Sequence, residues 1–214
     1  MARLTRVEQR EVTRQRLIEA AARVFCRTGF EAAPIDLIAE EAGFSRGAFY
    51  SNFESKDELF VELIRRHLDA EVTTLSHALD RIKSAADLAP AIERRYRVLG
   101  EDHSWCLLTT EFQLYTMRGG MKAEEFGEIY ESYRQRVGDL IAIHFERLGI
   151  ESRLTPYEFG VSQIALAHGL ALQRAANQSL KDTLPARALA TFVRGALAER
   201  RSGRRDVSAP NSRS

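Results

Sequence analysis

The chain has 214 residues, 44% of them hydrophobic, and its 31 basic and 30 acidic residues leave a formal net charge of +1. This length suits one large domain or two small ones, and the balanced charge gives no sign by itself of a nucleic-acid partner. No apolar run is long enough to cross a bilayer, no signal-peptide core follows Met1, and Cys26 and Cys106 lack the spacing of a metal site or a disulfide framework, so we expect a cytoplasmic protein without a membrane partner.

Basic residues gather at the two ends of the chain. Seven arginines lie among the first 28 residues, and four more lie between 200 and 205. We expect residues 1–11 to form a flexible basic arm. Residues 201–214 contain Gly, Ser, Pro, Asn and Arg without an apolar pattern, which predicts a disordered tail.

Three helical patterns follow one another in residues 12–54. The first ends at Gly29, and the second is expected to start at Pro34. Proline suits the first position of a helix because it lacks the N–H that would have no partner there. That helix ends at Gly43, and a short third helix covers residues 45–52. A compact helix, a glycine turn and a second short helix are the architecture of a helix-turn-helix, whose second helix lies in the DNA major groove. We therefore expect residues 12–54 to be a DNA-binding domain.

The outward face of the third helix carries groups that can contact DNA. Arg46 can bond a guanine with two hydrogen bonds, and Gly47 allows the backbone to approach a phosphate. Hydroxyl and amide groups can bond phosphate oxygens, and the start of the next helix also favours an anion. The predicted DNA-binding residues are Ser45, Arg46, Gly47, Tyr50, Ser51, Asn52 and Lys56.

The remainder, residues 55–200, is predicted to be a helical body. Ser55-Lys56-Asp57-Glu58 matches a capping box, in which Ser55 accepts from the Glu58 N–H, and it starts a long helix that reaches about Ile82. Further helices are predicted at 87–99, 104–118, 122–148, 156–177 and 185–200. The fold class is therefore all-α with about nine helices.

An ordered series of short motifs resembles the N-terminal signature of the TetR family of bacterial transcription regulators. The series covers about the first quarter of the chain. It consists of RLIEAA at Arg16–Ala21, Phe25, Gly29-Phe30, IAEEAG at Ile38–Gly43, SRGAFY at Ser45–Tyr50, Phe53, and KDEL at Lys56–Leu59. The resemblance implies a homodimeric regulator, released as a repressor from a palindromic double-stranded DNA operator by a small apolar or amphipathic molecule.

Two positions depart from the pattern of many family members. Ala33-Pro34 stands where a Ser or Thr hydroxyl often contacts phosphate at the start of the second helix. Ser51-Asn52 replaces an aromatic-His pair after Tyr50. Both changes indicate an operator contact pattern of this chain's own.

The middle helices carry aromatic stripes that could line a ligand pocket. The family resemblance implies that a small molecule binds among them, and an apolar cavity with a few polar groups is the usual design. His168 and Gln163 are such polar groups on an otherwise apolar helix. The alternative is ordinary core packing of the same aromatic residues. The predicted ligand-binding residues are Trp105, Phe112, Tyr115, Tyr130, Tyr133 and His144.

Two later helices are predicted to pair two copies of the chain. The resemblance implies that the helices at 156–177 and 185–200 form a four-helix bundle with their mates, and apolar residues at helical spacing agree with this. The alternative is intramolecular core. The predicted interface residues are Phe159, Leu166, Leu170, Leu189, Phe192, Val193 and Ala196.

Two other functional classes are alternatives, namely an enzyme and a helical protein that does not bind DNA. The sequence has no G-x-S-x-G elbow, P-loop, H-E-x-x-H or C-x-x-C motif, so we expect no enzyme, no metal and no cofactor. The second alternative is a ligand-binding helical protein that acts through protein partners without binding DNA. The sequence leaves open the operator, the regulated genes, the ligand, the choice between repression and activation, and whether the basic tail contacts DNA.

Overall fold

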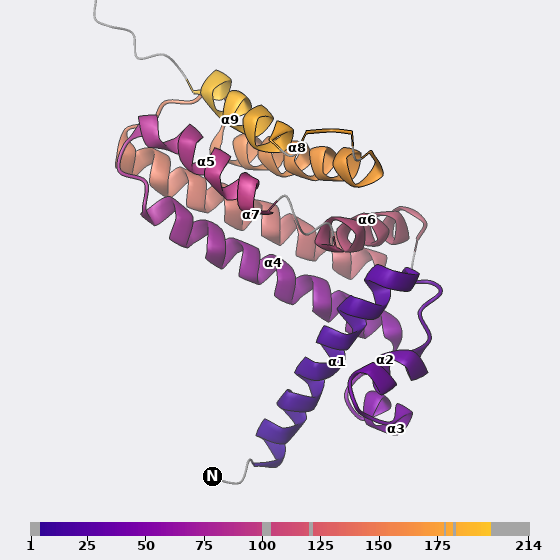
Figure 1. Ribbon diagram of the computed structural model, residues 1–214. Helices are drawn as coiled ribbons and strands as arrows, with labels where there is room; N and C mark the ends of the chain where they lie inside the picture. Colours follow the sequence, from indigo (N-terminus) through magenta and orange to yellow (C-terminus); the bar gives the residue numbers. More distant parts are fainter. Residues whose placement is uncertain (1–4, 100–103, 120–121, 178, 182, 198–214) are drawn as a thin grey trace, which may run out of the picture.

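The computed structural model describes residues 5–99, 104–119, 122–177, 179–181 and 183–197. These residues form nine α-helices and no strand beyond an isolated β-bridge between Ser152 and Leu197. The all-α prediction is confirmed. Figure 1 shows an elongated molecule, with α1, α2 and α3 forming a head at one end and the later helices forming the body.

The head begins earlier than the sequence predicts. Helix α1 spans Arg6–Thr28, and a reciprocal capping box between Thr5 and Glu8 starts it. The predicted flexible arm over residues 1–11 is therefore wrong from residue 6 onward, because this cap satisfies backbone groups at the helix start. Residues 1–4 lie outside the described part of the chain.

Two glycines set the turns of the head. Gly29 (φ +79°) ends α1, and Gly43 (φ +77°) separates α2 (Ile35–Glu41) from α3 (Arg46–Tyr50). Glycine suits both positions because a Cβ disfavours positive φ. Pro34 caps α2 in an extended conformation instead of forming its first turn, one residue away from the prediction.

Six helices form the body, within a few residues of the predicted bounds. Ser55 caps α4 as predicted, accepting from the Glu58 N–H, but the Glu58 carboxylate bonds the N–H of Glu54. The last helix ends at Ala196, short of the predicted residue 200. Residues 198–200 and the predicted disordered tail lie outside the described residues. The helices are α4 (Lys56–Asp80), α5 (Ala85–Leu99), α6 (Ser104–Met117), α7 (Ala123–Leu148), α8 (Pro156–Ala176) and α9 (Leu184–Ala196).

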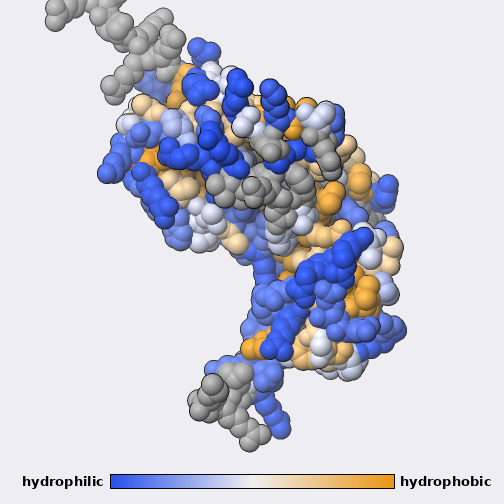
Figure 2. Space-filling view, in the orientation of Figure 1, coloured by the Kyte–Doolittle hydropathy of each residue, from blue (hydrophilic) through white to orange (hydrophobic). Residues whose placement is uncertain are grey.

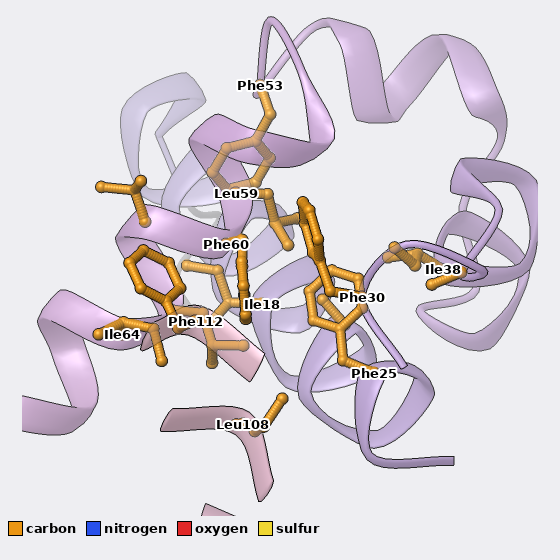
Figure 3. Packing of buried hydrophobic residues seen from close by; sticks show 14 of the residues in the cluster. Ile18, Phe25, Phe30, Ile38, Phe53, Leu59, Phe60, Ile64, Leu108 and Phe112 are labelled. Atoms are coloured by element: carbon orange, nitrogen blue, oxygen red, sulfur yellow. The ribbon is translucent and has the colours of Figure 1, made fainter. Parts of the chain in front are cut away.

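One hydrophobic core joins the head to the body. Phe30 of the α1–α2 turn stacks on Phe60 of α4 at 4.3 Å between ring centroids, and Phe60 lies 4.5 Å from Phe112 of α6. Figure 3 shows these rings in one cluster with head residues such as Phe25. A second core holds α5, α7 and α9 together. The head and the body, α6 included, are therefore joined by direct side-chain packing.

Candidate DNA-binding surface and ligand cavity

Helix α3 and its caps present five predicted residues to solvent. Ser45 caps the helix, and its hydroxyl accepts from the Ala48 N–H at 3.3 Å. Phe49 anchors the helix in the core, whereas the neighbouring Tyr50 is 48% exposed. Ser51 is exposed and its hydroxyl bonds the Gly47 carbonyl. We call this set the α3 surface: Ser45, Arg46, Gly47, Tyr50 and Ser51.

Arg46 is held near this surface by weak contacts. Its Nη1 lies 2.9 Å from Asp36 Oδ2 of α2, and both side chains are about 60% exposed. Its guanidinium also lies 5.7 Å from the centre of the Tyr50 ring. Exposed ion pairs of this kind are worth roughly 0–1 kcal/mol. Arg46 can therefore exchange Asp36 for another partner at little cost.

Two predicted DNA-binding residues have structural roles instead. Asn52 is 9% exposed and its Nδ2 donates to the Ala48 carbonyl at 2.8 Å, so its amide points into the head. The Lys56 Nζ donates to three backbone carbonyls, those of Phe30, Glu31 and Ala33, at 2.7, 3.0 and 3.1 Å. An ammonium has three N–H donors. Lys56 therefore has none left for a phosphate in this conformation.

A cavity of about 640 Å³ opens between α4, α5, α6, α7 and α8. Three predicted ligand residues line it, namely Trp105, Tyr130 and Tyr133. The indole of Trp105 stacks on the His67 ring with 3.7 Å between centroids. Figure 2 shows one face of the molecule, on which hydrophilic residues cover most of the surface of the body. The other residues that line the cavity are His67, Leu68, Glu71, Tyr96, Cys106, Thr109, Ile164, Ala167, His168 and Ala171.

The other three predicted ligand residues lie elsewhere. Phe112 is fully buried in the core that joins head and body. The Tyr115 hydroxyl donates to the Asp57 carboxylate and accepts from the Lys122 N–H. His144 is 6% exposed, with Nδ1 2.8 Å from the Leu140 carbonyl oxygen and Nε2 3.2 Å from Asp80 Oδ1. These side chains fill the core or join helices, so the pocket prediction is wrong for them.

Several of the cavity residues that the prediction missed are polar. His168 stands out in the sequence as a polar group on an apolar helix, and its Nε2 lies 2.9 Å from Thr110 Oγ1. His67 and Glu71 stand four residues apart on α4, so they share a face. In the sequence, the apolar stripe of this helix is the more evident pattern, so its polar side was not predicted to line a pocket. That side becomes a cavity wall only because α6 and α8 pack near it.

Burial favours the neutral form of several titratable groups in the cavity wall. Burial raises the pKa of Tyr96, Tyr130 and Tyr133, and it raises the pKa of the Cys106 thiol. Burial also lowers the pKa of His168, which favours the neutral imidazole. Glu71 is paired with Arg95 at 2.8 Å. The wall therefore offers neutral hydroxyls, an imidazole and aromatic faces to a bound molecule.

Helix α6 contacts both the cavity and the head. Trp105, Cys106 and Thr109 near its start line the cavity. Two residues after Thr109, the Glu111 carboxylate accepts from the Phe30 N–H in the α1–α2 turn. A Cβ on Gly29 would lie 2.8 Å from Glu111 Oε1, so the turn and α6 meet closely there. The same helix thus contacts both the cavity and the turn that precedes α2.

The predicted dimer residues divide into two groups. Phe159, Leu189, Val193 and Ala196 are at most 7% exposed and belong to the core around α5, α7 and α9, so the intramolecular alternative holds for them. Leu166, Leu170 and Phe192 are only partly buried. The exposed side of α8 next to the two leucines carries small residues, Ala165 and Gly169.

The sequence of the head matches a family model described as "Bacterial regulatory proteins, tetR family" over residues 17–63. The N-terminal domain belongs to the TetR family. The HTH-type transcriptional activator FasR of Mycolicibacterium smegmatis is 40% identical over 70 residues, which are 33% of this chain and 32% of that protein. The chain thus spans about a third of the length of this relative.

The body also has the fold of TetR-family structures. A putative TetR-family regulator from Mesorhizobium loti superposes with a TM-score of 0.70 at 16% identity, covering 90% of this chain and 96% of the other. A putative transcriptional regulator from Saccharomonospora viridis, in complex with choline, gives a TM-score of 0.70 at 21% identity over 87% of this chain and 98% of the other. Identities this low show the fold alone.

The structure adds two observations on other kinds of site. None of the described helices is both long and apolar enough to cross a membrane. Among the same residues, no three His, Cys, Asp or Glu side chains gather in a way that could hold a metal ion.

Proposed function

We propose that the chain is a DNA-binding transcriptional regulator that reads its operator through the α3 surface. The observation that carries this proposal is the set of exposed donors on α3, Arg46 and Tyr50 above all, in a domain of the TetR family. Neither side chain is buried in the core, so packing of the core does not explain the presence of these two residues. Helices of this length and position enter the major groove in helix-turn-helix proteins.

Each residue of the α3 surface has a role suited to its chemistry. Arg46 leaves Asp36 and bonds a guanine edge, a contact worth about 1–3 kcal/mol of discrimination between bases. The Ser45, Tyr50 and Ser51 hydroxyls bond phosphate oxygens and fix the position of α3 on the duplex. Gly47 leaves room for the backbone to approach the DNA.

A selection experiment tests this proposal and identifies the operator at the same time. The full chain is incubated with a pool of duplexes of random sequence, and bound molecules are recovered and sequenced. We expect a palindrome whose half-sites lie about one helical turn apart, or a multiple of it, because a symmetric dimer reads two grooves. Absence of any enriched sequence would favour the alternative in which the protein acts through protein partners.

The cavity is proposed as the effector site. Its volume and its aromatic, largely uncharged wall suit a small apolar or amphipathic molecule with a few hydrogen-bonding groups. Two structural neighbours carry ligands, a Bacillus subtilis regulator with stearoyl-CoA and the Saccharomonospora viridis protein with choline. A ligand at about a hundred times its Kd stabilises the fold by about 2.7 kcal/mol, so a thermal-shift screen of small amphiphiles can find it.

Ligand and DNA are proposed to be coupled through α6. A ligand against Trp105 or Thr109 moves α6, and Glu111 further along the helix carries the movement to the α1–α2 turn. A hundredfold loss of DNA affinity needs a coupling of about 2.7 kcal/mol, which is in the usual range. We propose repression as the default action; a promoter reporter in cells lacking the protein decides between repression and activation.

The dimer is proposed to form through the exposed sides of α8 and α9. The partly buried Leu166, Leu170 and Phe192 lie there beside small exposed residues that allow close helix approach. Two heads on a two-fold axis can reach successive major grooves about 34 Å apart. Avidity then raises the affinity well above that of one short helix.

A further inference from the structure

We propose that Arg6 and Arg10 of α1 extend the DNA interface and bind the sugar-phosphate backbone beside the site read by α3. We call these two residues the α1 arginine pair. The inference rests on the proposed function, since it concerns the same DNA. It adds a second contact surface on a helix to which no DNA contact is assigned above.

The first observation is that α1 continues past the edge of the head. Figure 1 shows its N-terminal turns projecting beyond α2 and α3, at the end of the molecule away from α9. Every residue from Arg6 to Arg10 is exposed, and Val7 is 79% exposed. More than one turn of helix thus lies outside the core. Hydrophobic packing, which holds the rest of α1, does not explain this extension.

The second observation concerns the face on which the arginines stand. Positions 6, 10 and 14 are four residues apart and share one side of the helix. Further along, the same side carries Leu17, Ile18 and Ala21, which are buried in the head. The stripe that faces the head's core therefore becomes cationic where the helix leaves the core.

Arg14 marks the point where this stripe meets α3. Its guanidinium lies 4.1 Å from the centre of the Phe53 ring, and its Nη1 donates to the Asn52 carbonyl. Asn52 directly follows Ser51 of the α3 surface. At 1.5 Å per residue, Arg10 and Arg6 lie about 6 and 12 Å further out along the helix axis. The cationic stripe is thus continuous with the proposed DNA-binding surface.

The third observation is charge. Neither Arg6 nor Arg10 has a hydrogen bond or ion pair within the described residues. The two acidic residues nearby are engaged: Glu8 closes the Thr5 capping box, and Glu11 pairs with Arg66 at 2.9 Å. Arg66 also bonds Gln15, so α4 braces the outer part of α1. Two unpaired cations on a braced helix suit a polyanion that meets the α3 surface.

The test compares salt dependence of binding to two duplexes. The probes are a mixed-sequence duplex of about 30 base pairs, three helical turns, and the duplex recovered by selection. The variant is Arg6→Gln with Arg10→Gln. The matched control, Arg81→Gln with Lys83→Gln, removes two exposed charges just after the distant end of α4. A second control is Arg16→Gln, which is exposed on the other side of α1.

The α1 arginine pair predicts a specific change in slope. Each lost phosphate contact reduces the magnitude of the slope of log affinity against log salt by about 0.9. Two arginines in each protomer make roughly four contacts in a dimer, so the variant's slope should be smaller in magnitude by about 3.6. Affinities for both duplexes fall by the same factor, because phosphates carry no sequence information. Both controls keep the wild-type slope, and circular dichroism of the variant shows the same helical content.

Three results would overturn the inference in different ways. If the variant keeps the wild-type slope, the α1 arginine pair is not at the DNA, while the proposed function stands. If either control flattens the slope as much as the variant, the effect is general charge and the site is rejected. If the wild-type chain binds neither duplex at low salt, the proposed function and this inference fail together.

Discussion

Lys56 bonds the turn between α1 and α2, which occupies all three donors of its ammonium. The KDEL motif places it at a helix start, where the sequence suggests an anion site. The structure instead gives its ammonium three carbonyl acceptors from residues 30–33. The sequence could not predict this, because the acceptors are backbone groups of a turn more than twenty residues away.

The first prediction follows from these bonds. Lys56→Met keeps most of the side-chain length and removes the charged donor, leaving three carbonyls without their partner. We expect the free energy of unfolding to fall by about 2–3 kcal/mol in a urea titration. Lys83→Met, at an exposed position, serves as the control and should change little. An unchanged stability together with weaker DNA binding would restore the phosphate role of Lys56.

The second prediction concerns pH and His168. Burial lowers the pKa of His168 in the folded protein below its ordinary value of 6.5. Below pH 6.5 the unfolded chain therefore binds more protons, and the stability carried by the neutral imidazole is lost as pH falls toward the folded pKa. Stability measured from about pH 7.5 to pH 5.5 should thus fall more in the wild type than in His168→Gln. Parallel curves would contradict this.

At the scale of elements, local signals predicted the helices well and their contacts poorly. Gly29, Gly43 and the Ser55–Glu58 capping-box motif, with their neighbours in sequence, set helix ends to within a residue or two. The approach of α6 to the α1–α2 turn depends on residues about eighty positions apart, and no periodicity encodes it. The cavity is likewise a product of five helices meeting, which explains why only three of six predicted pocket residues line it.

The third prediction tests the contact between α6 and the head. Gly29→Ala is strained by its positive φ and by Glu111 Oε1 2.8 Å from the new Cβ, and Glu111→Ala removes an acceptor from the Phe30 N–H. The two changes should be non-additive by about 0.5–3 kcal/mol in a double-mutant cycle of unfolding free energies, because the second relieves the clash of the first.

A matched cycle controls for backbone strain alone. Gly43 has a similar φ of +77°, but a Cβ added there would meet nothing within 4 Å. Gly43→Ala and Glu111→Ala should therefore add within about 0.5 kcal/mol. Additivity in the Gly29 cycle as well would mean that α6 does not press on the turn, and the proposed route from cavity to head would lose its support.

At the scale of the whole molecule, the sequence predicted the two-part organisation but not the shared core. Phe30, Phe60 and Phe112 each belong to a different predicted helix or turn, and their packing becomes visible only in three dimensions. The dimer prediction suffered from the same limit. Helical spacing identifies apolar faces. It does not distinguish a face that is buried against the protomer's own α5 from a face that could bind a second copy of the chain.

The fourth prediction concerns that second copy. Gly169 lies on the exposed side of α8 with nothing within 4 Å of an added Cβ, so Gly169→Glu leaves the protomer fold intact. Light scattering at micromolar concentration should give twice the chain mass of 24.2 kDa for the wild type and the single mass for the variant, because the proposed interface would have to bury an unpaired carboxylate from each copy.

The control for the dimer is Gly127→Glu on α7, an exposed helical glycine that is also free of contacts within 4 Å. It should remain dimeric. A dimeric Gly169→Glu protein would place the interface elsewhere, and a monomeric wild type would remove the dimer proposal.

The most direct test of DNA reading by α3 is a fluorescence-anisotropy titration of the selected duplex with wild-type protein, Arg46→Ala and the Arg81→Gln, Lys83→Gln control. Loss of the guanine contact should lower the preference for the selected over the mixed-sequence duplex by about 1–3 kcal/mol per contact, roughly five- to 150-fold. The control should match the wild type. An Arg46→Ala protein with unchanged affinity and preference would contradict the account, because α3 would then not be the element that reads DNA.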